Sequence, residues 1–261
     1  MPAKKRRKQV SPAARVSDDA LRRFGRLLRA WYRVHARDLP WRRTRDPYAI
    51  LVSELMLQQT QVLRVVPRWH EFLDRFPTLH TIAAAEVTQV EEAWEGLGYY
   101  ARARNLHRTS RLVTRDGSDA AATLPADAEA LRNLPGIGRY TAGAVASFAY
   151  GRRVPLVDTN VARVLQRVFL PRAKRKVAAT ENALWELAER SLPRGATAVW
   201  THNQALMEIG ALVCTARVMH CGRCPVRPVC GTYAEDQAEE SPGSRRAPTS
   251  SRSRGPTGRS T

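Results

Sequence analysis

Apolar residues recur at helical spacing along most of the chain, and no segment shows the strict alternation of a half-buried strand. Leu21, Phe24, Leu28 and Trp31, for example, follow one another at steps of three and four, and arginines occupy the opposite face. The same periodicity predicts further helices over residues 47–59, 62–76, 82–94, 99–113, 126–134, 161–170, 177–192 and 198–213. We therefore predict an all-α fold.

Residues 134–158, LPGIGRYTAGAVASFAYGRRVPLVD, join two helical segments through a Pro-Gly-x-Gly turn and end on a carboxylate, Asp158. Gly136 and Gly138 permit backbone angles that other residues resist, so the turn can be tight and its backbone exposed. The helix that opens near Arg139 presents bare amide groups, which suit an anion such as phosphate. An ordinary connection between two helices is the alternative, and the turn alone does not decide between the two.

Glu54 lies in the middle of the apolar helix PYAILVSELMLQQ. A carboxylate is costly to bury in its ionised form, so burial among these apolar residues would raise its pKa. A carboxyl that stays protonated near neutral pH can act as a general acid. Alternatively, Glu54 lies on a solvated face or caps a neighbouring backbone group.

A glycine-bounded break, GLGYY at residues 96–100, places Tyr99 and Tyr100 side by side. The two rings could be core residues, or they could form an aromatic wedge or stacking surface for nucleic acid. The helix that follows carries four basic side chains: Arg102, Arg104, His107 and Arg108. In the second case the rings would lie beside this basic helix.

The formal net charge is +19, and the ends of the chain carry much of it. Residues 1–17 hold six Lys or Arg and residues 241–261 hold five Arg, and neither segment contains an acid. We predict that residues 1–17 and 233–261 are disordered basic arms that strengthen non-specific binding to nucleic acid. The alternative is a pair of solubilising tails without a partner.

No apolar run approaches the roughly 18–20 residues that span a membrane, and no apolar segment follows the basic N-terminus. We therefore expect no membrane partner and a cytoplasmic, nucleoid-associated protein.

All four cysteines lie near the end of the predicted folded region, in the spacing C-x6-C-x2-C-x5-C. They are Cys214, Cys221, Cys224 and Cys230. Clustered thiols in a protein of this kind indicate a metal centre rather than disulfides. Both tetrahedral zinc and a four-iron cluster are compatible with four thiolates, and the spacing by itself leaves this choice open.

Together these features resemble the helix-hairpin-helix DNA glycosylase superfamily, from about residue 18 to residue 232. LPGIGRYTAGA is similar to its hairpin, VDTNVARVL to the segment with its catalytic aspartate, and the cysteine spacing to its [4Fe-4S] loop. Within the superfamily, LPWR, SELMLQQTQV and GLGYYARARNLH resemble the A/G-specific adenine glycosylases, the MutY family. The resemblance implies a [4Fe-4S] cluster bound by the four cysteines, and double-stranded DNA containing mismatched adenine as the partner of a monomeric enzyme.

The same resemblance implies roles for individual residues. Glu54 matches the general acid that protonates adenine, Asp158 the aspartate that stabilises the sugar cation, and Tyr140 and Asn160 the polar residues beside them. Seven residues match positions that line the adenine pocket: Arg37, Leu39, Trp41, Arg42, Leu57, Val62 and Glu208. Gln59 and Tyr99 match residues that intercalate near the opposing base, and Gly136 and Gly138 match those that bind the phosphate backbone.

Tyr140 also stands where the hairpin of bifunctional lyases carries a lysine, and no lysine occurs between Lys8 and Lys174. The resemblance therefore implies a monofunctional glycosylase that hydrolyses the N-glycosidic bond of adenine opposite 8-oxoguanine or guanine. Two alternatives are a glycosylase for thymine or uracil opposite guanine, and a catalytically silent iron–sulfur protein that binds DNA. Glu54 disfavours the first of these, and the presence of both carboxylates disfavours the second.

The implied architecture has two helical modules with a DNA-binding cleft between them. We expect a six-helix barrel with the hairpin over residues 41–154, and a cluster module that combines residues 18–40 with residues 155–232. Asp158 would then lie at the junction and face Glu54. Longer members continue into a Nudix-like domain that recognises 8-oxoguanine, whereas the predicted folded sequence here ends near Ala234, as expected for a short form. VDTN replaces the more common VDGN, so a threonine separates Asp158 from Asn160.

Overall fold

The structure is a computed structural model that describes residues 11–116, 122–174 and 177–240. Within these ranges all regular secondary structure is helical and there is no β-strand, which confirms the all-α prediction. The helices and 3-10 turns are η1 (Pro12–Arg15), α1 (Asp18–His35), η2 (Pro40–Arg42), α2 (Pro47–Met56), α3 (Val62–Arg75), α4 (Leu79–Ala84), α5 (Val87–Ala93), α6 (Ala101–Val113), α7 (Ala128–Arg132), α8 (Arg139–Phe148), α9 (Thr159–Phe169), α10 (Ala178–Ser191), α11 (Ala196–Leu212), η3 (Cys221–Arg223), η4 (Arg227–Val229) and α12 (Gly231–Glu240).

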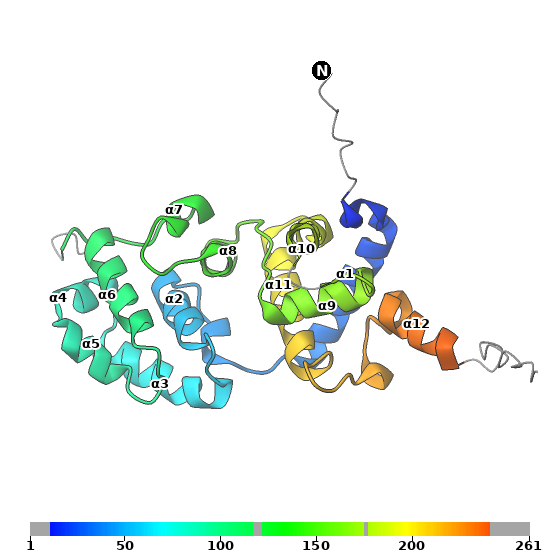
Figure 1. Cartoon of the computed structure of the whole chain (residues 1–261). Helices are drawn as coiled ribbons and strands as arrows, with labels where there is room; N and C mark the ends of the chain where they lie inside the picture. Colours follow the sequence, from blue (N-terminus) through cyan, green and yellow to red (C-terminus); the bar gives the residue numbers. More distant parts are fainter. Residues whose placement is uncertain (1–10, 117–121, 175–176, 241–261) are drawn as a thin grey trace, which may run out of the picture.

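The buried apolar side chains form two cores. Figure 1 shows the helices that carry them as two groups, α2 to α8 in one and α1 with α9 to α11 in the other. The first is built from residues 39–156, which carry α2 to α8. The second combines η1 and α1 with α9, α10 and α11. The chain therefore starts in the second core, crosses to the first and returns, so that two connections join the halves, one before α2 and one before α9.

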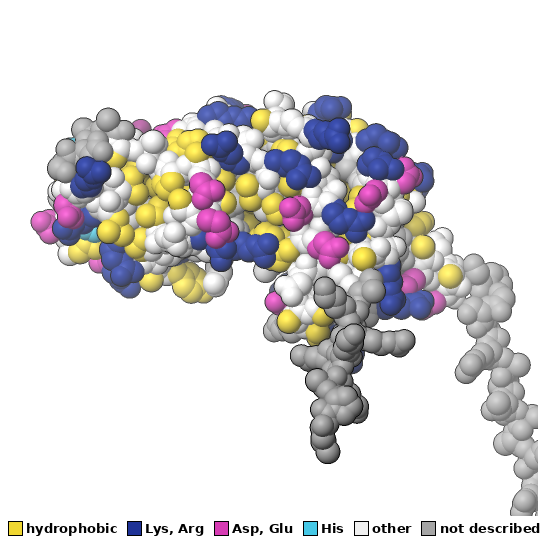
Figure 2. Space-filling view, turned by 90° about the horizontal axis from the view of Figure 1, so that it is seen from above, with side chains coloured by type: hydrophobic (Ala, Val, Ile, Leu, Met, Phe, Trp, Pro, Cys, Tyr) yellow, Lys and Arg dark blue, Asp and Glu magenta, His cyan; other side chains and the backbone are white. Residues whose placement is uncertain are grey.

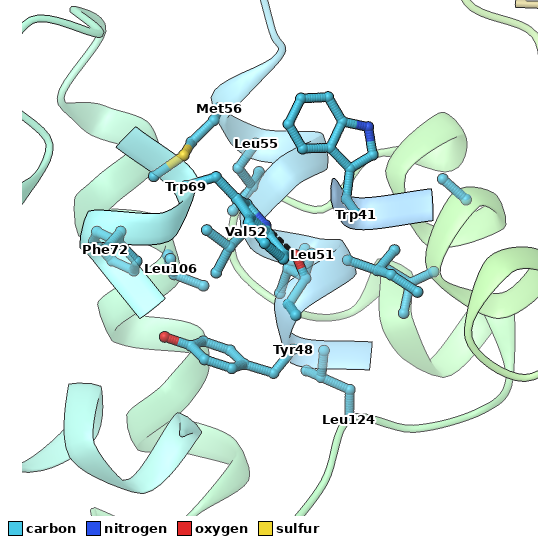
Figure 3. Close-up of a cluster of buried hydrophobic side chains, with 14 of the residues drawn as sticks. Trp41, Tyr48, Leu51, Val52, Leu55, Met56, Trp69, Phe72, Leu106 and Leu124 are labelled. Carbon is cyan, nitrogen blue, oxygen red and sulfur yellow. Dashed lines mark hydrogen bonds between the residues drawn. The ribbon is translucent and has the colours of Figure 1, made fainter. Parts of the chain in front are cut away.

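Helix α2 runs through the middle of the first core, and nine of its ten residues are buried (Figure 3). Trp69 anchors α3 to it, because its indole Nε1 donates a hydrogen bond of 2.9 Å to the Ala49 carbonyl oxygen. The Tyr48 hydroxyl donates to the Phe76 carbonyl oxygen at 2.6 Å, directly after the end of α3. A helix that is covered all round has no solvated face for a polar side chain. This removes the alternative in which Glu54 lies in solvent.

The predicted helix over residues 82–94 is wrong at its centre, where the chain breaks into α4 and α5. Ala85 is extended, and the Glu86 side chain caps the first turn of α5 in a reciprocal pair with Gln89. Such a capping box satisfies backbone amides that a continuous helix would use internally. As a consequence, seven helices instead of six lie between residues 41 and 154 in the described part of the chain.

Both ends of the packed structure extend beyond their predicted limits. Ala13 is fully buried, and the Arg190 guanidinium donates to the carbonyl oxygens of Ala13 and Val16 at 2.7 and 2.8 Å. Ser11 adds a hydrogen bond of 2.6 Å to Glu186. Residues 11–17 are therefore part of the fold, not of an arm, and α12 likewise continues to residue 240. The rest of both predicted arms, residues 1–10 and 241–261, lies outside the described residues.

Arginine and lysine side chains are spread across the face that includes α7, α8 and α10, with acidic and apolar side chains between them (Figure 2). This distribution agrees with the positive net charge and favours contact with a polyanion along a broad surface. Among the described helices, none is both long and apolar enough to cross a membrane.

Candidate active site

A pocket of about 580 Å³ lies between the two cores. The first half contributes η2, α2, residues 57–62 and the start of α8, and the second half contributes the start of α9 and one face of α11. Twelve of the predicted site residues line it: Arg37, Leu39, Trp41, Arg42, Glu54, Leu57, Gln59, Val62, Tyr140, Asp158, Asn160 and Glu208. Residues from distant parts of the sequence thus meet in one cavity.

Glu54 enters the pocket from α2 and is 6% exposed. Burial raises the pKa of its carboxyl to about 7, and the nearby charge of Asp158 acts in the same direction. A hydrogen bond with Tyr140 and the charge of Arg42 partly oppose this shift. At neutral pH, Glu54 is therefore close to half protonated, and it can hold or release a proton at small cost.

Tyr140 connects Glu54 to the second half of the molecule. Its hydroxyl hydrogen-bonds to the Glu54 carboxyl and also lies 3.0 Å from the Met207 Sδ on α11. Burial raises the pKa of this hydroxyl well above its usual value, so it stays protonated. Because the hydroxyl has a single proton, it donates to the ionised form of Glu54 and is free to donate to sulfur when Glu54 itself is protonated.

Asp158 caps the N-terminus of α9. Its Oδ1 accepts a hydrogen bond of 2.7 Å from the Val161 amide, and its Oδ2 accepts one of 3.2 Å from Asn160 Nδ2. Burial raises the pKa of Asp158, whereas these hydrogen bonds and the charge of Arg163 favour the ionised form. Glu54 and Asp158 thus have different environments, as an acid and an anionic stabiliser require.

Glu208 is fully buried on α11 and binds two arginines from the connection before α2. Arg37 donates to it through Nε and a terminal nitrogen at 2.9 and 2.7 Å, and Arg42 Nη2 donates at 2.8 Å. Burial alone would raise the pKa of this carboxyl, but the two guanidiniums together lower it to about 2. This ionised cluster joins the two halves of the molecule at the wall of the pocket.

The hairpin glycines lie outside the pocket, between α7 and α8. Gly136 has a φ of +74°, and a Cβ there would lie 2.7 Å from the Cβ of Asn105. Gly138 is different, because its φ is −80° and a Cβ there would meet no atom within 4 Å. The fold therefore requires glycine at 136 but not at 138, where the bare backbone at the start of α8 faces open space.

Tyr99 also lies outside the pocket and is 62% exposed, whereas Gln59 lines the pocket on an exposed loop. The basic helix beside Tyr99 presents only part of its charge to solvent. Arg102 and His107 are each 7% exposed and bind backbone carbonyl oxygens inside the protein.

The four cysteines are free thiols and line a second cavity, which α9 and residues 213–233 enclose. An Arg167 terminal nitrogen donates to Cys214 Sγ at 3.3 Å, and backbone amides point at the sulfurs of Cys224 and Cys230. Such N–H donors suit thiolate sulfur. Within the described residues no three of these side chains converge as ligands of a single metal ion, although all four surround one space.

Residues 52–190 match the family described as HhH-GPD superfamily base excision DNA repair protein. The chain belongs to the HhH-GPD superfamily. Among relatives, it is 42% identical to the adenine DNA glycosylase of Homo sapiens over 222 residues, which cover 82% of this chain and 40% of that protein. It is 46% identical to the adenine DNA glycosylase of Mycobacterium tuberculosis over 200 residues, 76% of this chain and 64% of that protein. The chain thus spans between two fifths and two thirds of the length of these relatives.

Solved HhH-GPD structures share the fold. A thermostable thymine-DNA glycosylase superposes with a TM-score of 0.75 at 29% identity, over 84% of this chain and 98% of that one. An endonuclease III–DNA complex superposes with a TM-score of 0.69 at 22% identity, over 85% and 99% of the two chains, which shows the common fold.

Several pocket residues were not predicted from the sequence: Gln58, Thr60, Thr159, Gln204, Met207 and Ala211. Met207 and Ala211 follow Gln204 at helical spacing on α11, and Glu208 lies on the same face. This spacing could have identified them in the sequence, because residues three and four positions from a pocket residue lie on the same face of its helix. Thr159 enters the pocket at the position where VDTN differs from VDGN.

Proposed function

We propose that this chain is a monofunctional DNA glycosylase that hydrolyses the N-glycosidic bond of adenine mispaired with 8-oxoguanine or guanine in duplex DNA. One observation carries the proposal: Glu54, a buried carboxyl with a pKa of about 7, shares its pocket with Tyr140 and with Asp158. The Asp158 carboxylate accepts hydrogen bonds from Val161 and Asn160. Two carboxyls with opposite tasks are the common requirement of glycosidic cleavage. The names of the relatives support adenine as the base that leaves.

In the proposed reaction, Glu54 protonates a ring nitrogen of adenine so that the base departs as a neutral molecule. Asp158 stabilises the positive charge that develops on the sugar, by charge or by transient attack on the anomeric carbon. A water molecule then completes hydrolysis at that carbon. Tyr140 and Asn160 position the two carboxyls through the hydrogen bonds described above.

A Schiff-base step has no nucleophile in this pocket. Lysine is absent among its lining residues, and Tyr140 occupies the hairpin position at which a lyase would have lysine. We therefore propose hydrolysis without strand cleavage by a lyase step.

The decisive experiment presents the purified protein with duplexes that contain 8-oxoguanine:A, G:A, G:T and G:U, followed by hot alkali to reveal abasic sites. Alkali-dependent cleavage at adenine supports the proposal. The similarity to a thymine-DNA glycosylase makes thymine or uracil opposite guanine the second candidate. Cleavage confined to G:T and G:U would replace the first proposal with the second, and cleavage of none would favour a silent DNA-binding protein.

We also propose that the four cysteines bind a [4Fe-4S] cluster. The donor set fits, because four free thiols surround one cavity and N–H groups point at three of the sulfurs. When bound, the cluster supplies four iron–thiolate bonds that cross-link residues 214–230. Iron and sulfide analysis with a visible absorption spectrum on protein purified without oxygen tests this, and stoichiometric zinc without iron would contradict it.

A further inference from the structure

Arg102, in the first turn of α6, donates hydrogen bonds into two separate loops. One terminal nitrogen lies 2.6 Å from the Leu55 carbonyl oxygen and 2.6 Å from that of Gln58, at the end of α2. The other lies 3.0 Å from the Leu97 carbonyl oxygen and 2.8 Å from that of Gly98, in the loop before α6. A single planar guanidinium therefore bridges residues 55–60 and 97–99.

The two loops share an unusual backbone feature. Gln59 has a φ of 57° and Tyr99 a φ of 48°, the left-handed conformation that residues other than glycine seldom adopt. Arg102 binds the carbonyl of Gln58 and that of Gly98, each of which belongs to the peptide unit immediately before the left-handed residue. The φ rotation of Gln59 and of Tyr99 starts from the peptide unit that Arg102 binds. Arg102 therefore fixes the orientation of the backbone from which the Gln59 and Tyr99 side chains project.

The Arg102 side chain is held on its other sides as well. Its guanidinium carbon lies 5.6 Å from the centre of the Trp94 ring and 5.5 Å from that of Tyr99. Within the described residues, the guanidinium binds carbonyl and hydroxyl oxygens and lies against these two rings, and it forms no ion pair with a carboxylate. A buried guanidinium satisfied by backbone carbonyls fixes loop geometry through several directed bonds at once.

We propose that Arg102 is a positioning residue that holds Gln59 and Tyr99 as one two-loop wedge, the part of the surface that fills the base stack when the target base leaves the duplex. This inference rests on the proposed function, since a wedge is required only if a base is extruded into the pocket. Left-handed residues that the surroundings fix in place are found where a protein pre-organises a contact. Arg102 itself does not reach the pocket that holds Glu54 and Asp158.

The test compares Arg102→Met, which keeps most of the side-chain volume but removes every donor, with Arg102→Lys, which keeps the charge but not the planar fork. Arg111→Met is the matched control, because Arg111 lies on the same helix, is exposed and pairs with Asp116. Single-turnover excision is measured for adenine in a G:A mismatch and for the same adenine in a one-nucleotide bulge, where it is already partly unstacked. Thermal unfolding of each variant is measured in parallel.

We expect Arg102→Met to slow excision from the mismatch about 10- to 100-fold, the cost of misplacing a positioning group. Excision from the bulge should slow by less than about threefold, because little unstacking remains to be done. Arg102→Lys should fall between, and Arg111→Met should match the parent protein on both substrates. Equal losses on mismatch and bulge would show a merely structural role and overturn the proposal.

A second readout separates this proposal from the proposed function. With 2-aminopurine placed next to the target adenine, binding of the parent protein should raise the fluorescence as the neighbouring stack opens, and Arg102→Lys should reduce that rise. This signal requires no excision. If the parent protein binds and opens the stack but removes no adenine, the proposed function fails while the proposal for Arg102 stands. If the fluorescence rise is unchanged in both Arg102 variants, the proposal for Arg102 alone is overturned.

Discussion

The Tyr140 hydroxyl forms a hydrogen bond with the Glu54 carboxyl between α8 and α2, in a site where burial raises the pKa of both groups. This bond favours the ionised form of Glu54 and so limits how far burial raises its pKa. The resulting value of about 7 lies near the pH at which a general acid is most useful.

Excision of adenine should slow as the pH rises through 7. The reaction needs the protonated form of Glu54, and the fraction of that form falls tenfold for each pH unit above its pKa of about 7. Single-turnover rates measured between pH 5.5 and 9 on a fixed mismatch duplex test this. A rate that is constant up to pH 9 would contradict the role of Glu54 as the acid.

Glu54→Gln should remove the acid and lower the excision rate by about 10²- to 10⁴-fold. The variant should still bind the mismatch duplex, because the substitution leaves the outer surface of the protein unchanged. Binding is measured by fluorescence anisotropy in the same buffer as the excision assay. Full activity of the variant would exclude Glu54 from catalysis.

The same substitution should stabilise the fold at high pH. The carboxyl has a raised pKa in the folded state, so the native protein binds more protons than the unfolded chain between pH 4.5 and 7, and stability is lost as the pH rises across that window. The loss is roughly 3 kcal/mol and is complete above pH 7. Urea unfolding should therefore show Glu54→Gln to be more stable than the parent at pH 8 and similar to it at pH 4. An equal difference in stability between Glu54→Gln and the parent at pH 4 and pH 8 would show that the charge of Glu54 is not the cause.

Glu208→Gln should destabilise the protein by about 3 kcal/mol, because it leaves two guanidiniums in the cluster without their anion. Both arginines bind the buried Glu208 carboxyl, and their connection joins the two halves of the molecule. Asp38→Asn is the control, since Asp38 pairs with Arg43 while both side chains are 69% exposed. Solvent screens this exposed pair, so Asp38→Asn should leave the free energy of unfolding almost unchanged. Urea unfolding of both variants at pH 7 makes the comparison.

The two hairpin glycines should respond differently to alanine. Gly136→Ala must relieve a contact with Asn105 at a φ of +74°, so it should lower the unfolding temperature. Gly138→Ala meets no neighbour and should leave stability unchanged, but it should weaken DNA binding if the backbone there approaches a phosphate. Anisotropy titrations at several salt concentrations measure that effect. Unchanged affinity in Gly138→Ala would remove this residue from the DNA contact.

Helical periodicity was sufficient to predict most helices, because each has an apolar face that must be buried. It failed between Ala85 and Val87, where a local capping interaction of Glu86 outweighs a continuous pattern. The sequence around Glu54 left burial and a solvated face both open, and the structure decides for burial because α2 has no solvated side. Arg102 shows the limit of such reasoning, because an arginine in a basic segment resembles a surface residue until the carbonyls that surround it are known. The burial of Ala13 depends in the same way on Arg190, which is distant in the sequence.

The route of the chain between its two cores has a consequence for the order of folding during synthesis. Residues 39–156 contain the whole first core, so this half can fold as soon as it has left the ribosome. Helix α1 is made earlier, yet Phe24 and Leu28 are buried by helices that begin only after Asp158. Helix α1 is therefore made before the first core but reaches its place only after α9, α10 and α11 have been made. The pocket, which needs residues from both halves, is completed only when α11 docks.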